Sequence, residues 1–167
     1  MIVNEIIQGE ETGMAVKRIR HYRNPVLRRA CREVKTVDDT VRRLLGDMMD
    51  TLHHSEDGAA LAANQVGILL RLVVVDYEGN VLKLVNPRIV EQSGRQDCVE
   101  GCLSFPGIVG KTVRPQKVTV LALDENGDEL CITGEGEMAK CFCHELDHLD
   151  GILFSDRASA LYKVKKR

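Results

Sequence analysis

The stretch CFCHELDHLDG, residues 141–151, is the densest concentration of chemically active side chains in the sequence and decides its interpretation. Its two histidines, His144 and His148, are four residues apart, so on an α-helix they lie one turn apart on one face and can reach the same metal ion. Glu145 stands beside them, where a carboxylate can handle the proton of a water molecule that the metal activates. Two ligands rarely make a useful site, so the pattern requires a third ligand.

The third ligand is not supplied by the continuation of the motif. The longer pattern H-E-x-x-H-x-x-G-x-x-H fits the chain as far as Gly151, but Phe154 stands where the last histidine belongs. No histidine follows His148 and no glutamate follows Glu145. Two downstream carboxylates, Asp150 and Asp156, are conceivable, and an upstream ligand is favoured. The upstream candidates are His21, His53, His54, Cys31, Cys98, Cys102, Cys131, Cys141 and Cys143.

Cys102 is favoured among these candidates by its surroundings. It lies in DCVEGCLSFPG, residues 97–107, a glycine-flanked loop between strands where the backbone can bend close to a ligand and present N–H groups. A thiolate with two imidazoles leaves a fourth position for water, as catalytic metal sites require. A loop cysteine without a task is the alternative.

The composition indicates one globular domain. The chain has 167 residues, with 44% hydrophobic and 29% charged residues, and its net charge of −2 gives no sign of a DNA or membrane partner. Residues 1–13 contain three glutamates and no basic residue, unlike a secretory signal or a transit peptide. We expect a cytoplasmic protein with free thiols, in which residues 1–13 form an N-terminal extension and residues 14–167 form the domain.

Hydrophobic periodicity predicts two helices. The first has Thr36 as its cap and ends near the SEDG of residues 55–58. The second runs from about Glu137 to His148 or Leu149 and carries the histidine motif. The residues predicted to face the core are Val37, Val41, Leu44, Leu45, Met48, Met49 and Leu52 in the first helix, and Met138, Phe142, Leu146 and Leu149 in the second.

The middle of the chain predicts strands at residues 69–77, 81–90, 117–124 and 129–133, which are rich in Val, Ile and Leu. The turns DYEGN and DENGD favour antiparallel hairpins. The basic stretch KRIRHYRNPVLRR, residues 17–29, is expected to be an extended surface arm. Helices on both sides of a strand-rich middle predict an α+β fold.

Three motifs in order resemble those of the peptide deformylases. GAALAANQVG (58–67), EGCLS (100–104) and HELDH (144–148) are similar to the family patterns GxGxAAxQ, EGCLS and HExDH. SFPG, VRP and LDGILFSDR match between and after them, so the resemblance covers about residues 17–157. It implies the deformylase fold, in which antiparallel sheets pack around a central helix that bears the HExxH motif.

The resemblance also implies the reaction, which is removal of the formyl group from the N-terminal formylmethionine of nascent polypeptides, with release of formate. It implies one divalent metal ion, usually Fe(II) in this family, with Ni, Co or Zn able to occupy the same site. The metal ligands that it implies are Cys102, His144 and His148.

The remaining catalytic roles are also implied by the resemblance. Glu145 would be the general base and then the general acid. The side-chain amide of Gln65 and the backbone N–H of Leu103 would stabilise the developing charge on the formyl oxygen. Glu100 and Arg114 could form an ion pair that supports the cysteine loop, although two unpaired surface charges are an equal alternative.

The sequence departs from the family pattern at three positions. Ala60 replaces the second glycine of GxGxAAxQ, Asn64 stands where proline is common, and Cys143 stands where glutamine usually precedes the motif histidine. All groups that perform chemistry are present, so we expect activity. A non-catalytic metal-binding relative and an HExxH metallopeptidase are the alternatives. The basic end LYKVKKR, residues 161–167, could contact ribosomal RNA, or it could be a solvated terminus.

Overall fold

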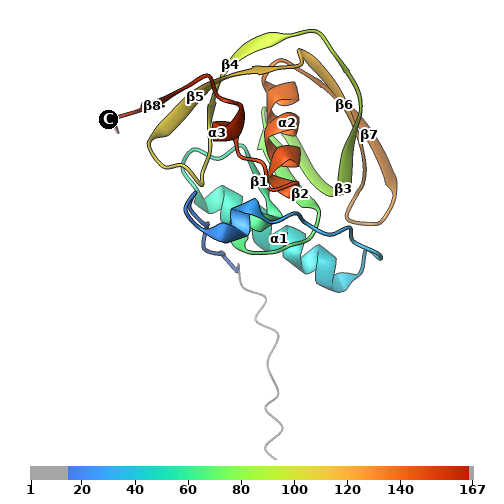
Figure 1. Ribbon diagram of the computed structural model, residues 1–167. Coiled ribbons are helices and arrows are strands. Elements are labelled where there is room, and N and C mark those ends of the chain that lie inside the picture. Colours follow the sequence, from blue (N-terminus) through green and yellow to red (C-terminus); the bar gives the residue numbers. More distant parts are fainter. Residues whose placement is uncertain (1–14, 166–167) are drawn as a thin grey trace, which may run out of the picture.

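The computed structural model describes residues 15–165 (Figure 1). The expected extension at residues 1–13 lies outside the described residues, and the domain boundary after it stays a prediction. In chain order the elements are η1 (Pro25–Arg28), α1 (Asp39–His54), β1 (Ala60–Ala62), η2 (Ala63–Val66), β2 (Leu72–Tyr77), β3 (Asn80–Ser93), β4 (Gln96–Gly101), β5 (Ile108–Arg114), β6 (Lys117–Leu123), β7 (Glu129–Glu135), α2 (Glu137–Leu149), α3 (Phe154–Arg157) and β8 (Ala160–Lys163).

Two antiparallel sheets surround α2, as expected for the predicted α+β fold. The larger sheet has the strand order β1-β2-β3-β6-β7, and the smaller sheet has the order β4-β5-β8. Helix α2 lies between them and contacts β1, β2, β6 and β7 of the larger sheet and β5 of the smaller one (Figure 1). The metal motif is therefore carried by the most enclosed helix of the fold.

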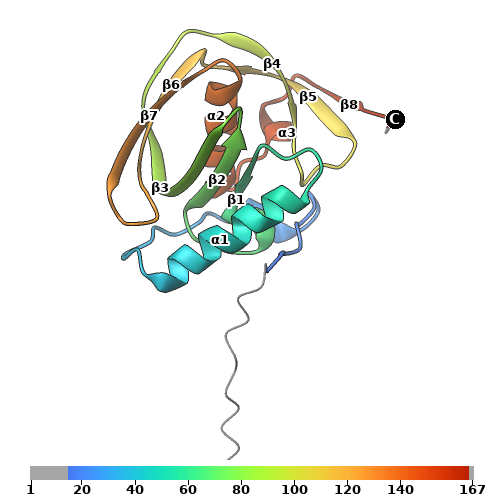
Figure 2. The same cartoon turned by 180° about the vertical axis from the view of Figure 1, so that it is seen from behind.

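The two long helices cover opposite faces of the larger sheet (Figure 2). In β2, Val73 and Val75 pack in the cluster that contains α2, whereas Leu72 and Val74 pack in the cluster that contains α1. Because both faces of β2 are buried, its sequence is a continuous apolar run rather than an alternating one.

Helix α2 spans the predicted residues, and of its predicted core residues Phe142, Leu146 and Leu149 are buried and Met138 is half-buried. Helix α1 ends at His54, as predicted, but its cap was predicted wrongly. The carboxylate of Asp38, not Thr36, accepts the hydrogen bond from the Val41 N–H at 2.9 Å. Asp38 stands next to the first helical residue, and its negative charge also interacts favourably with the helix dipole.

Both predicted hairpins are present. Strands β2 and β3 are joined at the paired residues Tyr77 and Asn80, and Glu78 and Gly79 between them have φ values of 48° and 79°, as a tight two-residue turn requires. Strands β6 and β7 pair from Leu123 and Glu129 onward. The predicted strand at 69–77 begins later, at Leu72, and the strand at 81–90 extends over residues 80–93. The short strand β1 and the whole smaller sheet were not predicted.

The basic arm at residues 17–29 is extended only in part. Its Leu27 is completely buried in η1. The Arg20 N–H donates to the Gln65 carbonyl at 2.7 Å, and the Tyr22 N–H donates to the Ser104 carbonyl at 2.9 Å. The arm thus lies against η2 and against the loop after β4, both of which carry predicted site residues. Within residues 15–165, no helix combines the length and the apolar character that crossing a membrane would need.

Candidate metal centre

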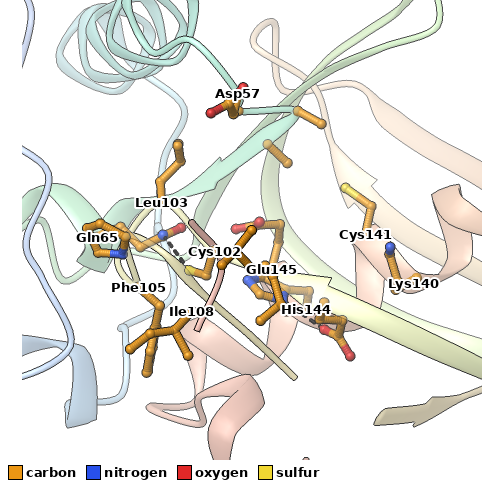
Figure 3. Close-up of a pocket in the computed structure, with 18 of the residues that line it drawn as sticks. Asp57, Gln65, Cys102, Leu103, Phe105, Ile108, Lys140, Cys141, His144 and Glu145 are labelled. Atoms are coloured by element: carbon orange, nitrogen blue, oxygen red, sulfur yellow. Dashed lines mark hydrogen bonds and ion pairs between the residues drawn. The ribbon is translucent and has the colours of Figure 1, made fainter. Parts of the chain in front are cut away.

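A cleft of about 850 Å³ opens beside β1, the loop that follows β4, and α2. Figure 3 shows Gln65, Cys102, His144 and Glu145 gathered in its centre, with Leu103 beside them. These residues come from three separate motifs of the sequence, and the fold brings all three motifs to one side of the cleft.

Three metal-binding side chains meet at this point. One donor atom from each of Cys102, His144 and His148 lies within 4.8 Å of the other two. The Cys102 sulfur is 3.3 Å from Nε2 of His148. Cys102 follows β4 directly, in the predicted loop between strands. Among the described residues, the structure brings no other candidate for the third ligand to the two histidines.

His144 is oriented by a buried carboxylate. Its Nδ1 lies 2.8 Å from Glu100, which turns Nε2 toward the site. Glu100 accepts two hydrogen bonds from Arg114, at 2.8 and 2.9 Å, and one from the Thr112 hydroxyl. The predicted ion pair between Glu100 and Arg114 is confirmed, and both side chains are almost completely buried.

The ion pair continues into a wider network that the sequence did not indicate. Arg114 also donates to Asp147 at 2.7 Å, and Asp147 accepts from Arg157 at 2.6 and 2.9 Å. Asp147 is the fourth residue of HELDH, so its place in that motif was the available signal. The network ties α2 to β5 of the smaller sheet and to α3.

The pKa shifts of Glu100 and His144 indicate surroundings that favour a positive charge. Burial alone would raise the pKa of Glu100, but hydrogen bonds from His144, Arg114 and Thr112 outweigh it and hold the pKa well below its usual range. Burial lowers the pKa of His144, but its hydrogen bonds to Cys102 and Glu100 raise the pKa by more. The surroundings of His144 therefore favour positive charge, which a divalent cation supplies.

His148 is prepared for ligation in a different way. Burial and the neighbouring His144 hold the pKa of His148 well below its usual range, so the ring is neutral, as metal binding requires. A thiol and two imidazoles in this arrangement suit a divalent ion of the first transition series. The residues present thus fit one metal ion, with Cys102, His144 and His148 as its protein ligands.

Glu145 lies next to the ligands in a buried environment. Its side chain lines the cleft and is buried, and Oε2 has no hydrogen-bond partner among the described residues. Burial raises the pKa of Glu145 to about 7. A divalent cation beside it would favour its carboxylate form, so the group can exchange a proton near neutral pH.

The Gln65 amide has a fixed orientation. Its oxygen accepts the Ala62 N–H at 2.9 Å, and its NH₂ group points toward Ser104 Oγ at 3.1 Å and Cys102 Sγ at 3.4 Å. The donor end of this amide therefore faces the site (Figure 3). Leu103 follows Cys102 directly and also lines the cleft.

A model of the polypeptide deformylase family matches residues 16–164. The chain belongs to the peptide deformylase family. Peptide deformylase 2 of Clostridium acetobutylicum is 55% identical over 150 residues, which cover 90% of this chain and 100% of the relative. The peptide deformylase of Natranaerobius thermophilus is 47% identical over 155 residues, which cover 92% of this chain and 99% of the relative.

Solved deformylase structures share the fold. The crystal structure of the peptide deformylase from Legionella pneumophila matches with a TM-score of 0.83 at 42% identity, covering 87% of each chain. The Thermotoga maritima enzyme matches with a TM-score of 0.83 at 36% identity, covering 87% of this chain and 99% of that one. The protein is a deformylase that removes the N-formyl group from nascent peptides. The comparisons therefore favour this function over a non-catalytic metal-binding relative and over an HExxH metallopeptidase.

The three departures from the deformylase pattern are all buried. Ala60 lines the cleft from β1, and among the described non-glycine residues only Glu78 and Asn86 have positive φ, so Ala60 carries no left-handed strain. Cys143 lies on α2, and burial raises the pKa of its thiol to about 11. Asn64 is completely buried in η2, immediately before Gln65.

We predict that Cys102→Ala and His148→Ala each remove the metal, because two remaining ligands hold an ion poorly. Metal content after anaerobic purification and dialysis, measured by elemental analysis, checks this. Cys131→Ala is the matched control, since Cys131 is an exposed cysteine on β7 and should leave metal content unchanged. Stoichiometric metal in Cys102→Ala would mean that the ligand set is wrong.

Proposed function

We propose that the Cys102–His144–His148 site is the catalytic centre at which the deformylase hydrolyses the formyl group of N-formylmethionyl nascent peptides. The observation that carries this proposal is the meeting of three metal-binding side chains and the buried Glu145 in one cleft. A divalent ion held there would polarise the formyl carbonyl and make a water molecule more acidic. The chain's own residues would supply the proton transfer and the orientation.

We propose Glu145 as the general base and acid. Its Oε2 has no hydrogen-bond partner among the described residues and its side chain lines the cleft, so the carboxylate can accept a proton from the attacking water without competing hydrogen bonds. The same carboxyl then donates that proton to the amine of the departing peptide. Its raised pKa keeps both protonation states within reach near neutral pH.

We propose Gln65 and Leu103 as the donors that stabilise the negative charge on the formyl oxygen. An amide is a poor electrophile, and preorganised N–H groups aimed at the oxygen lower the barrier without reorganising during the reaction. The Gln65 NH₂ group meets this description because the Ala62 N–H fixes its orientation. Leu103 would contribute its backbone N–H, next to the ligand Cys102.

Fe(II) is the metal that we propose, on the family resemblance. The donor set of one thiolate and two imidazoles also suits Zn, Ni and Co. Protein purified without oxygen should contain iron and lose activity in air, and regain it with Fe(II). A zinc-loaded enzyme whose kcat/KM equals that of the iron enzyme would contradict the choice of metal but not the reaction.

We predict that the enzyme releases formate from formyl-Met-Ala-Ser and leaves the unformylated peptide uncut. Glu145→Gln should keep the metal but lower kcat by about 10² or more, the usual scale of general acid–base catalysis. Formate release and metal content are measured on the same preparation. Equal loss of metal in this variant would make Glu145 a ligand or a structural residue instead, and cleavage of the unformylated peptide would indicate a peptidase.

We propose the ribosome as the partner of the basic C-terminal end. We propose the cytoplasm as the location of the enzyme, and fractionation of cells should recover the enzyme there. The tail cannot simply be deleted from residue 163, because Lys163 pairs with Ile108 in the smaller sheet and both Val164 and Lys165 line the cleft. Such a deletion would damage the site as well as the tail.

Charge reversal separates the two effects. We predict that Lys166→Glu with Arg167→Glu weakens co-sedimentation with ribosomes, most clearly at low salt, because phosphate contacts are lost. Hydrolysis of the short formylated peptide should stay within about twofold. Lys35→Glu with Arg43→Glu, two exposed residues elsewhere, makes the same change in net charge and is the control. Equal effects of the two pairs on ribosome binding would rule out a specific role of the tail.

A further inference from the structure

We propose that Asn64 is a positioning residue that holds the Gln65 turn against the metal-binding end of α2 and so sets the distance between Gln65 and His148. This inference rests on the proposed role of Gln65 in the reaction. Asn64 is one of the positions at which the chain departs from the common deformylase pattern.

Asn64 makes a buried polar contact that needs a reason. Its exposed fraction is 0%, and its side-chain NH₂ donates a short hydrogen bond to the backbone carbonyl of His148. Burying an amide costs free energy unless hydrogen bonds compensate for the lost water. An apolar residue would avoid that cost in this core, where Ala62 and Ala63 are also completely buried. The hydrogen bond to α2, rather than apolar packing, therefore accounts for an asparagine at this position.

The contact joins two elements that carry different parts of the reaction. His148 is a metal ligand at the C-terminal end of α2, and Gln65 follows Asn64 directly in η2. The next helix carbonyl, that of Leu149, is held by the Cys31 N–H at 2.8 Å and by Arg71 at 3.4 Å. Those two residues lie in other segments of the chain. Asn64 is thus the side chain that ties this helix end to the turn that carries Gln65.

A second observation involves the same two residues. Nδ1 of His148 and Oδ1 of Asn64 are both buried and have no hydrogen-bond partner among the described residues. A metal-binding histidine almost always donates its second ring N–H to an acceptor, which fixes the ring and strengthens it as a ligand. The amide that already contacts the His148 backbone carries a free acceptor oxygen. Since both atoms lack a partner, they do not bond each other, and Asn64 acts on His148 through the backbone carbonyl alone.

Such coupling matters because the reaction depends on small distances. The formyl oxygen must lie within hydrogen-bond reach of the Gln65 amide while the reacting carbon stays beside the metal ligands. A displacement of about 1 Å between the two can cost about 10² in rate. Without Asn64, η2 and α2 would be held together by apolar contacts, which fix orientation less sharply than a hydrogen bond.

Asn64→Leu tests the inference, because leucine has a similar size and cannot donate the hydrogen bond to the His148 carbonyl. The Co(II)-substituted protein gives a readout that does not depend on activity. We expect the dissociation constant for Co(II), measured by chelator competition, to rise by about tenfold or more, the usual effect of losing such a supporting contact. We also expect kcat to fall by about tenfold or more, with KM for the formylated peptide within about threefold.

Val66→Ala is the matched control. Val66 is a buried apolar residue of the same 3-10 helix, so the substitution should lower the melting temperature while Co(II) affinity and kcat stay within about twofold. Asn64→Ala, which adds no bulk, is measured in the same way in case leucine prevents folding. Co(II) affinity and kcat within twofold of the parent in the Asn64 variants, or equal losses in Val66→Ala, would overturn the proposal. An inactive parent enzyme would overturn the proposed function alone, since Co(II) affinity would still report on Asn64.

Discussion

The buried ion pair between Glu100 and Arg114 is the interaction on which the rest of the site depends. Removing two charges from water costs several kcal/mol for each ion, so such a pair persists only where geometry and further hydrogen bonds compensate. Here the guanidinium meets both carboxylate oxygens and also reaches Asp147, and the carboxylate also accepts from Thr112 and His144. The result is a rigid connection between the smaller sheet and α2. The loop that carries Cys102 begins at the end of that connection.

The same ion pair explains why strands β4 and β5 of the smaller sheet were not predicted from the sequence. Helices α1 and α2 and the β2–β3 and β6–β7 hairpins bury apolar side chains, so their patterns predict them. The smaller sheet departs from the usual relation between burial and hydrophobicity. Its inward residues include Glu100, Thr112 and Arg114, whereas Val99 and Val113 on its outer face are 58% and 46% exposed. Burial still alternates along β4 and β5, but polar and apolar residues stand on both faces, so no clear pattern of apolar residues marks these strands.

The candidate site was predictable to the extent that it is local. HELDH gave two ligands and Glu145 from helix spacing alone, and the choice of Cys102 became firm through its resemblance to a family motif. The residues that support the site could not be predicted in this way. Asn64 and Arg157 act on partners that are 84 and 10 residues away in the chain, through contacts that only the folded structure brings about. Their side chains have no periodicity or spacing that marks them, because a single hydrogen bond leaves no pattern.

The position of the last described residues has a practical consequence. Strand β8 runs along β5, and the chain leaves it with Val164 and Lys165 on the wall of the cleft. A tag, reporter or linker fused directly after Lys165 would start at the wall of the cleft, beside the space that an incoming peptide needs. The first described residue, Ala15, is not among the residues that line the cleft, so comparing fusions at the two ends would reveal how much of the cleft a long substrate occupies.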